Sequence, residues 1–358
     1  MNGVVSSGNM VYNTLGKSGL LVSKLSFGSW VTFNEQVDVE LAYSLMKRAY
    51  ELGCNLFDNA ETYAAGAAES IMGEAFHRGV KEGVWTREDL VLTTKIFFGG
   101  RGARDTHTSK GCSRKHIVEG LQASLKRMQL EHVDVVFCHR PDPLTPIEET
   151  VRAMNHVIDR GYAFYWGTSE WSAQEITEAC RVADVNGLIR PLCEQPQYNI
   201  FHRHRVEIEY EPLYREFGLG TTIWSPLAWG ILSGKYSGKN IPAGSRLSLE
   251  KYKGLKEAAF TEREWQIERT DQLKPIAQEL GCTVAQLAVA WCAANPHVST
   301  VITGATKIEQ LEENFKAMDI VPKLTPEVMK RIDEVAQTKP DYNPEMKMAR
   351  RVRGIEKS

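Results

Sequence analysis

Two stretches of the chain decide its fold: LVLTTK at residues 90–95 and VDVVFCH at residues 133–139. Each is a short run of apolar and β-branched residues that ends on an ionisable side chain, which is typical of a buried β-strand. Between them, Ser113 can cap a helix that runs to about Met128 with apolar residues at helical spacing. The three segments together predict a strand, a helix and a second parallel strand.

The same alternation continues on both sides of this unit. We expect eight strands in all, each followed by a helical stretch, at Lys24–Phe27, Leu56–Asp58, Leu90–Lys95, Val133–Cys138, Ala163–Trp166, Leu192–Gln195, Thr221–Trp224 and Thr300–Thr303. A single helix is predicted over about Val206–Phe217, and others over Ala68–Phe76 and Thr283–Ala294. Eight such units predict a closed (β/α)₈ TIM barrel. An open doubly wound sheet is the competing architecture, but no glycine-rich GxGxxG turn follows the first strand.

Two regions interrupt this rhythm. Tyr12–Ser23 contains two short β-like runs around a Gly-Lys-Ser-Gly turn and predicts a hairpin ahead of the barrel. Gly230–Asp271 is a long insertion after the seventh strand, and insertions of that length are often lids or ligand clamps. We therefore expect one barrel domain over residues 11–340, with flexible tails at 1–10 and 341–358.

Composition narrows the class of protein. The net charge of -2 gives no reason to expect nucleic acid as a partner. Seven scattered cysteines without a CxxC spacing indicate reduced thiols in a cytoplasmic protein, and neither a zinc site nor any other metal site is expected. The first residues lack the features of a secretory signal, and no apolar run approaches the ~18 residues of a membrane span.

Four residues at or just beyond strand ends carry the chemistry: Asp58, Tyr63, Lys95 and His139. Carbonyl reduction delivers a hydride to carbon and a proton to oxygen. A tyrosine, with a pKa of ~10, becomes a better donor when a lysine ammonium lowers that pKa, and a carboxylate keeps the lysine charged. An imidazole can orient the carbonyl oxygen. Each residue alone has an ordinary structural explanation; their joint placement favours one catalytic tetrad.

Three separated stretches resemble the aldo-keto reductase family. They are residues 53–63 (GCNLFDNAETY), 128–136 (MQLEHVDVV) and 301–305 (VITGA), and the resemblance covers roughly residues 11 to 340. It implies a (β/α)₈ barrel, NADPH/NADP⁺ as cofactor, and reduction of aldehydes or ketones with the four residues as catalytic groups.

A narrower resemblance is to the β-subunits of voltage-gated potassium channels. It rests on residues 28–33, 140–143, 148–154 and 224–228. Animal subunits tend to carry Asn in place of His139 and Arg in place of Glu170, so this chain is more similar to the plant and microbial type, in which the tetrad is complete. The resemblance implies a tetramer and a potassium channel α-subunit as a possible partner. Glu170 departs from one implied cofactor contact.

The family resemblance also assigns cofactor contacts along the chain. Ser169 and Gln195 would meet the nicotinamide carboxamide, Trp224 would stack on its ring, and the turn from Ser225 would bind the pyrophosphate. The implied cofactor set is Trp30, Gln36, Asp58, Ser169, Gln195, Trp224, Ser225, Pro226, Leu227, Gly230, Lys235, Arg246, Gly304, Thr306, Gln310, Glu313 and Asn314. Arg246 with Thr306 or Lys307 would form a 2′-phosphate site, which favours NADPH over NADH.

The substrate pocket is predicted to be aromatic. Substrate contacts are expected from Trp30, Tyr63, Phe97, His139 and Trp229, with Phe33, Phe98 and Trp171 also near strand ends. Three functions remain open at this stage. They are an NADPH-dependent reductase of small carbonyl compounds, a redox-sensing regulatory subunit of a channel, and a scaffold that binds no nucleotide.

Overall fold

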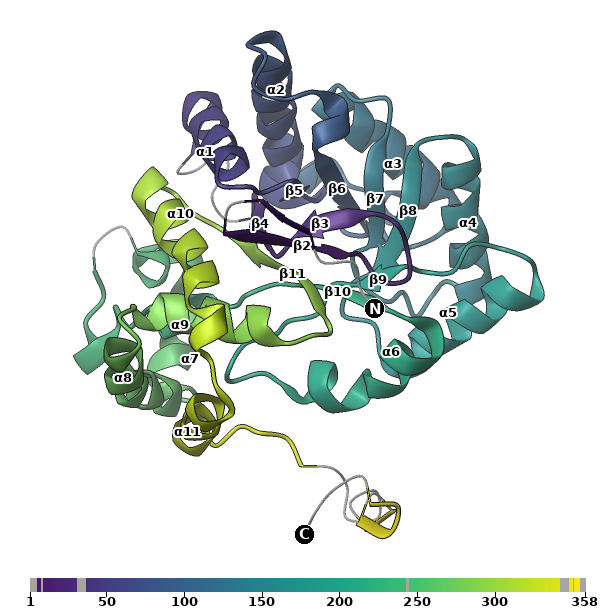
Figure 1. Ribbon diagram of the computed structural model, residues 1–358. Helices are drawn as coiled ribbons and strands as arrows, with labels where there is room; N and C mark the ends of the chain where they lie inside the picture. The colour runs from purple at the N-terminus through teal and green to yellow at the C-terminus, as the bar shows by residue number, and fades with distance from the viewer. Residues whose placement is uncertain are drawn as a thin grey trace.

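Eight parallel strands close into one barrel in this computed structural model, which describes residues 5–7, 9–30, 37–242, 245–341, 348–349 and 351–354 (Figure 1). Their order around the barrel follows the chain, and the last strand pairs with the first to close it. The strands are β4 (Leu25–Gly28), β5 (Leu56–Asp58), β6 (Val91–Ile96), β7 (Val133–Cys138), β8 (Ala163–Thr168), β9 (Cys193–Glu194), β10 (Gly220–Ile223) and β11 (Val298–Thr303). The predicted (β/α)₈ barrel is confirmed.

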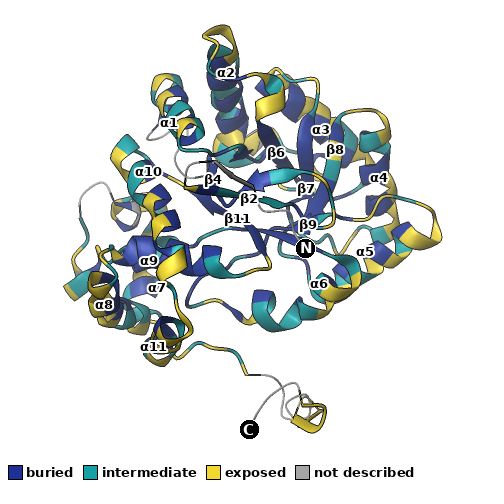
Figure 2. Cartoon of the chain, in the orientation of Figure 1, coloured by how far each residue is buried: buried dark blue, intermediate teal, exposed yellow. Residues whose placement is uncertain are grey.

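Helices surround the barrel, with their outer faces exposed and the strands buried (Figure 2). They are α1 (Val39–Glu51), α2 (Ala67–Lys81), α3 (Arg114–Met128), α4 (Ile147–Asp159), α5 (Ala173–Val185), α6 (Glu211–Phe217), α7 (Lys253–Phe260), α8 (Glu264–Glu279), α9 (Val284–Ala294), α10 (Ile308–Phe315) and α11 (Pro326–Ala336). Side-chain caps start several of them: Ser113 accepts the backbone N–H of His116 at 3.3 Å, as its place before the helix predicts.

The helix expected over Val206–Phe217 is divided in two. A π-helical turn, Arg205–Glu209, is followed after Tyr210 by α6, with Pro212 in its first turn. Proline has no backbone N–H to donate and is favoured in the first turn of a helix, so the chain restarts there. Helix α2, in contrast, is longer than predicted: it continues beyond Phe76 to Lys81.

A small antiparallel sheet covers the N-terminal end of the barrel (Figure 1). The predicted hairpin is β2 (Met10–Thr14) and β3 (Leu21–Ser23), and β1 (Val5–Ser7) adds a third strand within the segment expected to be a tail. Leu15 and Val22 pack against barrel residues such as Val135. Gly16 lies so close to β9 that a Cβ there would be 2.5 Å from the carbonyl oxygen of Leu192. The hairpin therefore closes this end of the barrel.

The opposite end, where the parallel strands finish, is left to the connecting loops. The insertion after β10 forms the short turn η6 (Ala228–Ser233) and further turns before α7 and α8, and it lies beside this end. Within the described residues, no single helix satisfies both length and apolarity for a membrane crossing. Only α8 and α9 taken together, bent at 85°, satisfy that criterion.

Candidate active site

The four predicted catalytic residues meet at the C-terminal end of the barrel. Asp58 ends β5, Lys95 lies near the end of β6, and Tyr63 opens the short turn η1 (Tyr63–Gly66). The Lys95 Nζ donates to Asp58 Oδ2 at 2.6 Å, to the carbonyl oxygen of Asn59 at 2.7 Å and to Tyr63 Oη at 3.1 Å. All three ammonium protons are used, so the ammonium is fixed against the phenol.

The carboxylate of Asp58 is fixed from its other side. Its Oδ1 accepts hydrogen bonds from Thr93 Oγ1 at 2.8 Å and from Gln195 Nε2 at 3.1 Å. Lys95 is fully buried and Asp58 is 3% exposed. Burial lowers the pKa of Lys95, but the charge of Asp58 and the hydrogen bonds to Asp58 and Tyr63 outweigh burial and leave that pKa raised. The ammonium therefore stays charged at neutral pH.

Tyr63 differs from the expectation in one respect. The sequence predicts that Lys95 makes the phenol more acidic. Lys95 does lower the pKa of Tyr63, but burial raises it by more, and the net pKa lies above the ordinary value. At neutral pH the phenol consequently carries its proton. The ammonium at 3.1 Å is placed to stabilise the phenolate once that proton has left.

His139 follows β7, and its ring stands at 77° to the ring of Tyr63, with ring centroids 5.8 Å apart. Burial, with the charges of Lys95 and Arg140, holds the pKa of His139 well below its usual value. The imidazole is therefore neutral. Its Nδ1 is buried and has no hydrogen-bond partner among the described residues. A buried nitrogen without a partner in the protein can hydrogen-bond a ligand that enters the site.

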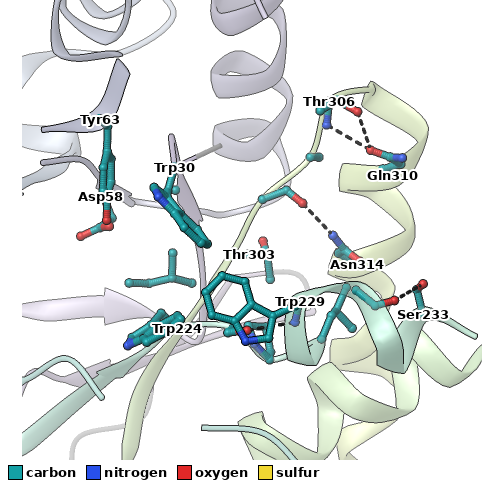
Figure 3. Close-up of a pocket in the computed structure, with 18 of the residues that line it drawn as sticks. Trp30, Asp58, Tyr63, Trp224, Trp229, Ser233, Thr303, Thr306, Gln310 and Asn314 are labelled. Atoms are coloured by element: carbon teal, nitrogen blue, oxygen red, sulfur yellow. Dashed lines mark hydrogen bonds between the residues drawn. The ribbon is translucent and has the colours of Figure 1, made fainter. Parts of the chain in front are cut away.

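A cavity of about 840 Å³ extends from these residues across the barrel end (Figure 3). Tyr63 and Asp58 lie at one side of it, and Thr306, Gln310 and Asn314 lie at the other. Predicted cofactor residues that line it are Trp30, Asp58, Ser169, Gln195, Trp224, Ser225, Pro226, Leu227, Gly230, Lys235, Gly304, Thr306, Gln310, Glu313 and Asn314. The structure thus brings together segments from both halves of the chain.

Three tryptophans form the centre of the cavity wall (Figure 3). The ring centroid of Trp30 lies 6.4 Å from that of Tyr63, 6.3 Å from Trp224 and 5.3 Å from Trp229. Trp224 is fixed by Glu170, whose Oε1 accepts its indole N–H at 2.9 Å. The other oxygen of Glu170 pairs with Arg205 at 2.5 Å. The residue that departs from the family pattern therefore positions an aromatic wall.

The turn after β10 adopts an uncommon backbone. Ser225, Ala228 and Trp229 have φ angles of 59°, 46° and 62°, in the left-handed region that non-glycine residues rarely enter. Ser225 Oγ accepts the backbone N–H of Trp229 at 3.2 Å and stabilises the turn. Strained backbone of this kind persists where the surrounding structure fixes it and is often found at ligand sites.

The far side of the cavity is polar, and its side chains are hydrogen-bonded to one another and to the backbone. Gln310 Oε1 accepts from both the backbone N–H and the hydroxyl of Thr306, at 3.0 and 3.1 Å (Figure 3). Ser245 also lines the cavity, is 8% exposed, and its Oγ has no partner among the described residues. An elongated cavity with unpartnered polar atoms at both Ser245 and His139, and with aromatic walls between, fits a dinucleotide.

Some predicted residues lie elsewhere. Phe97 and Trp171 are not in the cavity lining and pack in the core beside α3 and α5, while Phe98 does line it. Gln36 and Phe33 fall outside the described residues, as does the side chain of Arg246. Among the described residues, no group of three or more metal-ligating side chains occurs.

Sequence reasoning missed three contributors. Arg140 lines the cavity and follows His139 directly, so its position at a strand end was the available signal. Ser245 precedes Arg246 in the insertion. The third is the hydrogen bond from Trp224 to Glu170. These two residues lie 54 positions apart, so no local sequence pattern indicates the contact.

Comparison with known proteins agrees with this geometry. The model of the Aldo/keto reductase family matches residues 24–337. Two similar proteins, from Oryza sativa subsp. japonica and Arabidopsis thaliana, are both described as "Probable voltage-gated potassium channel subunit beta". Each is 57% identical over 331 residues, which cover 92% of this chain and 98% of the relative. The chain therefore belongs to the aldo/keto reductase family, whose members are oxidoreductases.

Proposed function

We propose that the protein reduces aldehydes and ketones with NADPH and that Tyr63 donates the proton. The observation that carries this proposal is the 3.1 Å hydrogen bond from the buried Lys95 to the phenol of Tyr63, at the edge of a cavity that fits a dinucleotide. Few structural roles require a fully buried ammonium to contact a phenol beside a cavity, whereas the contact assists a phenol that donates a proton.

The residues act as follows. The carbonyl oxygen of the substrate is held between Tyr63 Oη and the neutral imidazole of His139. NADPH, which residues such as Ser169, Gln195 and Trp224 would hold, would supply the hydride for the carbonyl carbon. Tyr63 gives its proton to the oxygen, which yields the alcohol, and Lys95 stabilises the resulting phenolate until solvent returns a proton. Asp58 keeps the ammonium of Lys95 oriented through their 2.6 Å contact.

NADPH is favoured over NADH because Lys235 and Lys307 line the cavity, Lys307 beside the polar pair of Thr306 and Gln310. An extra phosphate there would gain charge-assisted hydrogen bonds. Quenching of the fluorescence of Trp30, Trp224 and Trp229 on titration with each nucleotide measures the two dissociation constants. Equal affinity for NADH and NADPH would contradict this preference, and no quenching with either would favour a scaffold.

Tyr63→Phe tests the catalytic role. The expected result is a loss of aldehyde-dependent NADPH oxidation by roughly 100-fold or more, with NADPH binding retained. Tyr162→Phe is a matched control, because Tyr162 hydrogen-bonds Gln122 on the outer surface, away from the cavity. Aldehyde reduction by Tyr63→Phe at the wild-type rate would refute Tyr63 as the donor.

A second candidate function comes from the relatives described as channel subunits. As a channel subunit, the protein would form a tetramer, bind the α-subunit of a voltage-gated potassium channel, and report the redox state of its bound nucleotide. Light scattering in solution tests the assembly, for which a mass of about 160 kDa is expected, four times the 40.3 kDa chain. Co-elution with a detergent-purified channel from the same organism tests the partner. A monomer that does not co-elute would exclude this function but leave the reductase proposal intact.

A further inference from the structure

Among the residues that the structure describes, those on the substrate side of the cavity carry one positive charge without a matching negative one. Asp58 and Lys95 neutralise each other at 2.6 Å. His139 is neutral for the reasons given above. Arg140, the remaining ionisable residue that lines this side, is a permanently charged guanidinium. The space in front of Tyr63 is therefore positive on balance.

Arg140 has unused donors. Its Nη1 donates to the carbonyl oxygen of His139 at 2.5 Å and to Ser169 Oγ at 3.3 Å, and both acceptors are uncharged. No carboxylate in the described part of the chain lies within salt-bridge distance of it, and its Nε and Nη2 have no partner there. A guanidinium presents five N–H donors in a plane, so the edge that carries Nε and Nη2 is free.

The nearest acidic residue in sequence does not supply the missing charge. Asp142 accepts hydrogen bonds from the backbone of Cys112 at 2.7 Å, from Thr145 Oγ1 at 2.7 Å and from the backbone of Leu144 at 3.0 Å. These contacts hold the carboxylate in its own loop. The positive charge of Arg140 is consequently left to the cavity.

The guanidinium also rests on a fixed surface. It lies 5.8 Å from the ring centroid of Phe98, which itself packs against the ring of His139 at 5.1 Å. The loop that carries Phe98 is pinned on both sides, because Glu61 Oε1 accepts the backbone N–H of Phe97 at 2.7 Å and of Gly99 at 2.9 Å. A cation so placed is pre-organised, which reduces the entropy lost when it binds an anion.

We propose that Arg140 is a specificity-determining residue that selects carbonyl substrates bearing a carboxylate. The carboxylate binds the free edge of the guanidinium while the carbonyl oxygen lies between Tyr63 and His139. The hydride and proton transfers are those of the proposed reductase, on which this inference rests. Charge-assisted hydrogen bonds of this kind are expected to favour the anion by about 10- to 100-fold in kcat/KM.

Matched pairs of substrates measure this preference. One pair is 4-carboxybenzaldehyde and 4-formylbenzamide, and the other is benzoylformate and benzoylformamide. Within a pair the shape is nearly the same and the charge differs, while the two pairs place the carboxylate at different distances from the carbonyl. The wild-type protein should prefer the carboxylate in at least one pair, and added salt should reduce that preference.

Arg140→Met should abolish the preference by lowering kcat/KM for the carboxylates much more than for the neutral amides, since it removes the charge but keeps much of the length. Arg140→Lys should retain part of the preference for the carboxylates, because it keeps the positive charge. Arg215→Met is the control, because it removes one positive charge from the exposed surface of α6, where Arg215 pairs with Glu211 and Glu216. NADPH affinity, measured by fluorescence quenching, should be unchanged in all three variants.

Three outcomes are distinguishable. In the first, the wild type reduces the neutral amides and yet shows no preference for the carboxylates, or a preference that Arg140→Met retains. In that case this inference is wrong and the reductase proposal stands. If Arg140→Met weakens NADPH binding and slows every substrate equally, Arg140 serves the cofactor and the inference is also wrong. If the wild type reduces no member of either pair, the failure is that of the proposed function.

Discussion

Replacing Glu194 with Gln should remove a pH dependence of stability that the structure builds into β9. Glu194 is fully buried, its Oε2 accepts from Thr168 Oγ1, and its Oε1 has no partner among the described residues. Burial, with a smaller contribution from the charge of Glu170, raises the pKa of Glu194 to about 8. The carboxyl group is therefore protonated in the folded protein at neutral pH but ionised in the unfolded chain.

The sign and size follow from this difference. Between its ordinary pKa of 4.5 and about 8, the folded state binds one proton that the unfolded state has lost, so stability falls as pH rises. A difference of roughly 3.5 pH units at 1.36 kcal/mol per unit gives about 5 kcal/mol across the whole window. Glu194→Gln has no proton to lose. Its free energy of unfolding should therefore rise relative to wild type by about 4 kcal/mol between pH 5 and pH 8.

Urea unfolding of both proteins at half-unit pH steps measures this difference. Because both proteins share every other titrating group, those contributions cancel in the comparison. Glu74→Gln, on the exposed face of α2, is the control and should follow wild type at every pH. A difference between wild type and Glu194→Gln that stays constant with pH, within about 0.5 kcal/mol, would show that Glu194 ionises normally in the folded protein.

Three further variants or conditions test the site. Lys95→Met should lower kcat while leaving NADPH affinity unchanged, and urea unfolding should show a loss of about 3–5 kcal/mol, because Asp58 is left buried and unpaired. Glu170→Ala should weaken NADPH binding by roughly tenfold and shift tryptophan emission to longer wavelength, since Trp224 loses the acceptor of its indole N–H. Because the pKa of His139 is held well below its usual value, the imidazole stays neutral from pH 6 to 8, and profiles of kcat should show no protonation step from it in that range.

The barrel could be predicted from local patterns, because short β-like runs alternate with amphipathic helical stretches along the chain. The tetrad could be predicted for the same reason, since residues at the ends of successive parallel strands must meet at one end of a barrel. Asp58, Lys95 and His139 occupy such ends, and family motifs supported them. The signal at Ser113 was equally local, a single capping side chain before an amphipathic run.

What sequence reasoning could not supply depends on burial and on distant contacts. The net pKa of Tyr63 is set by how deeply the phenol is buried, which outweighs the adjacent charge that the sequence makes visible. The contact of Glu170 with Trp224, like the free edge of Arg140, exists only once loops from different strands are assembled. The break at Tyr210 could have been predicted, because Pro212 is unfavourable inside a helix.

The hairpin at the N-terminal end of the barrel affects how ligands enter and leave. Leu15 and Val22 close one end of the barrel, and the cavity lies at the opposite end. In the proposed reductase, substrate and nucleotide would therefore enter and leave at the same end of the barrel. Of two ligands that share this cavity, the deeper one would bind first and be released last, so its rate of release would place an upper limit on turnover.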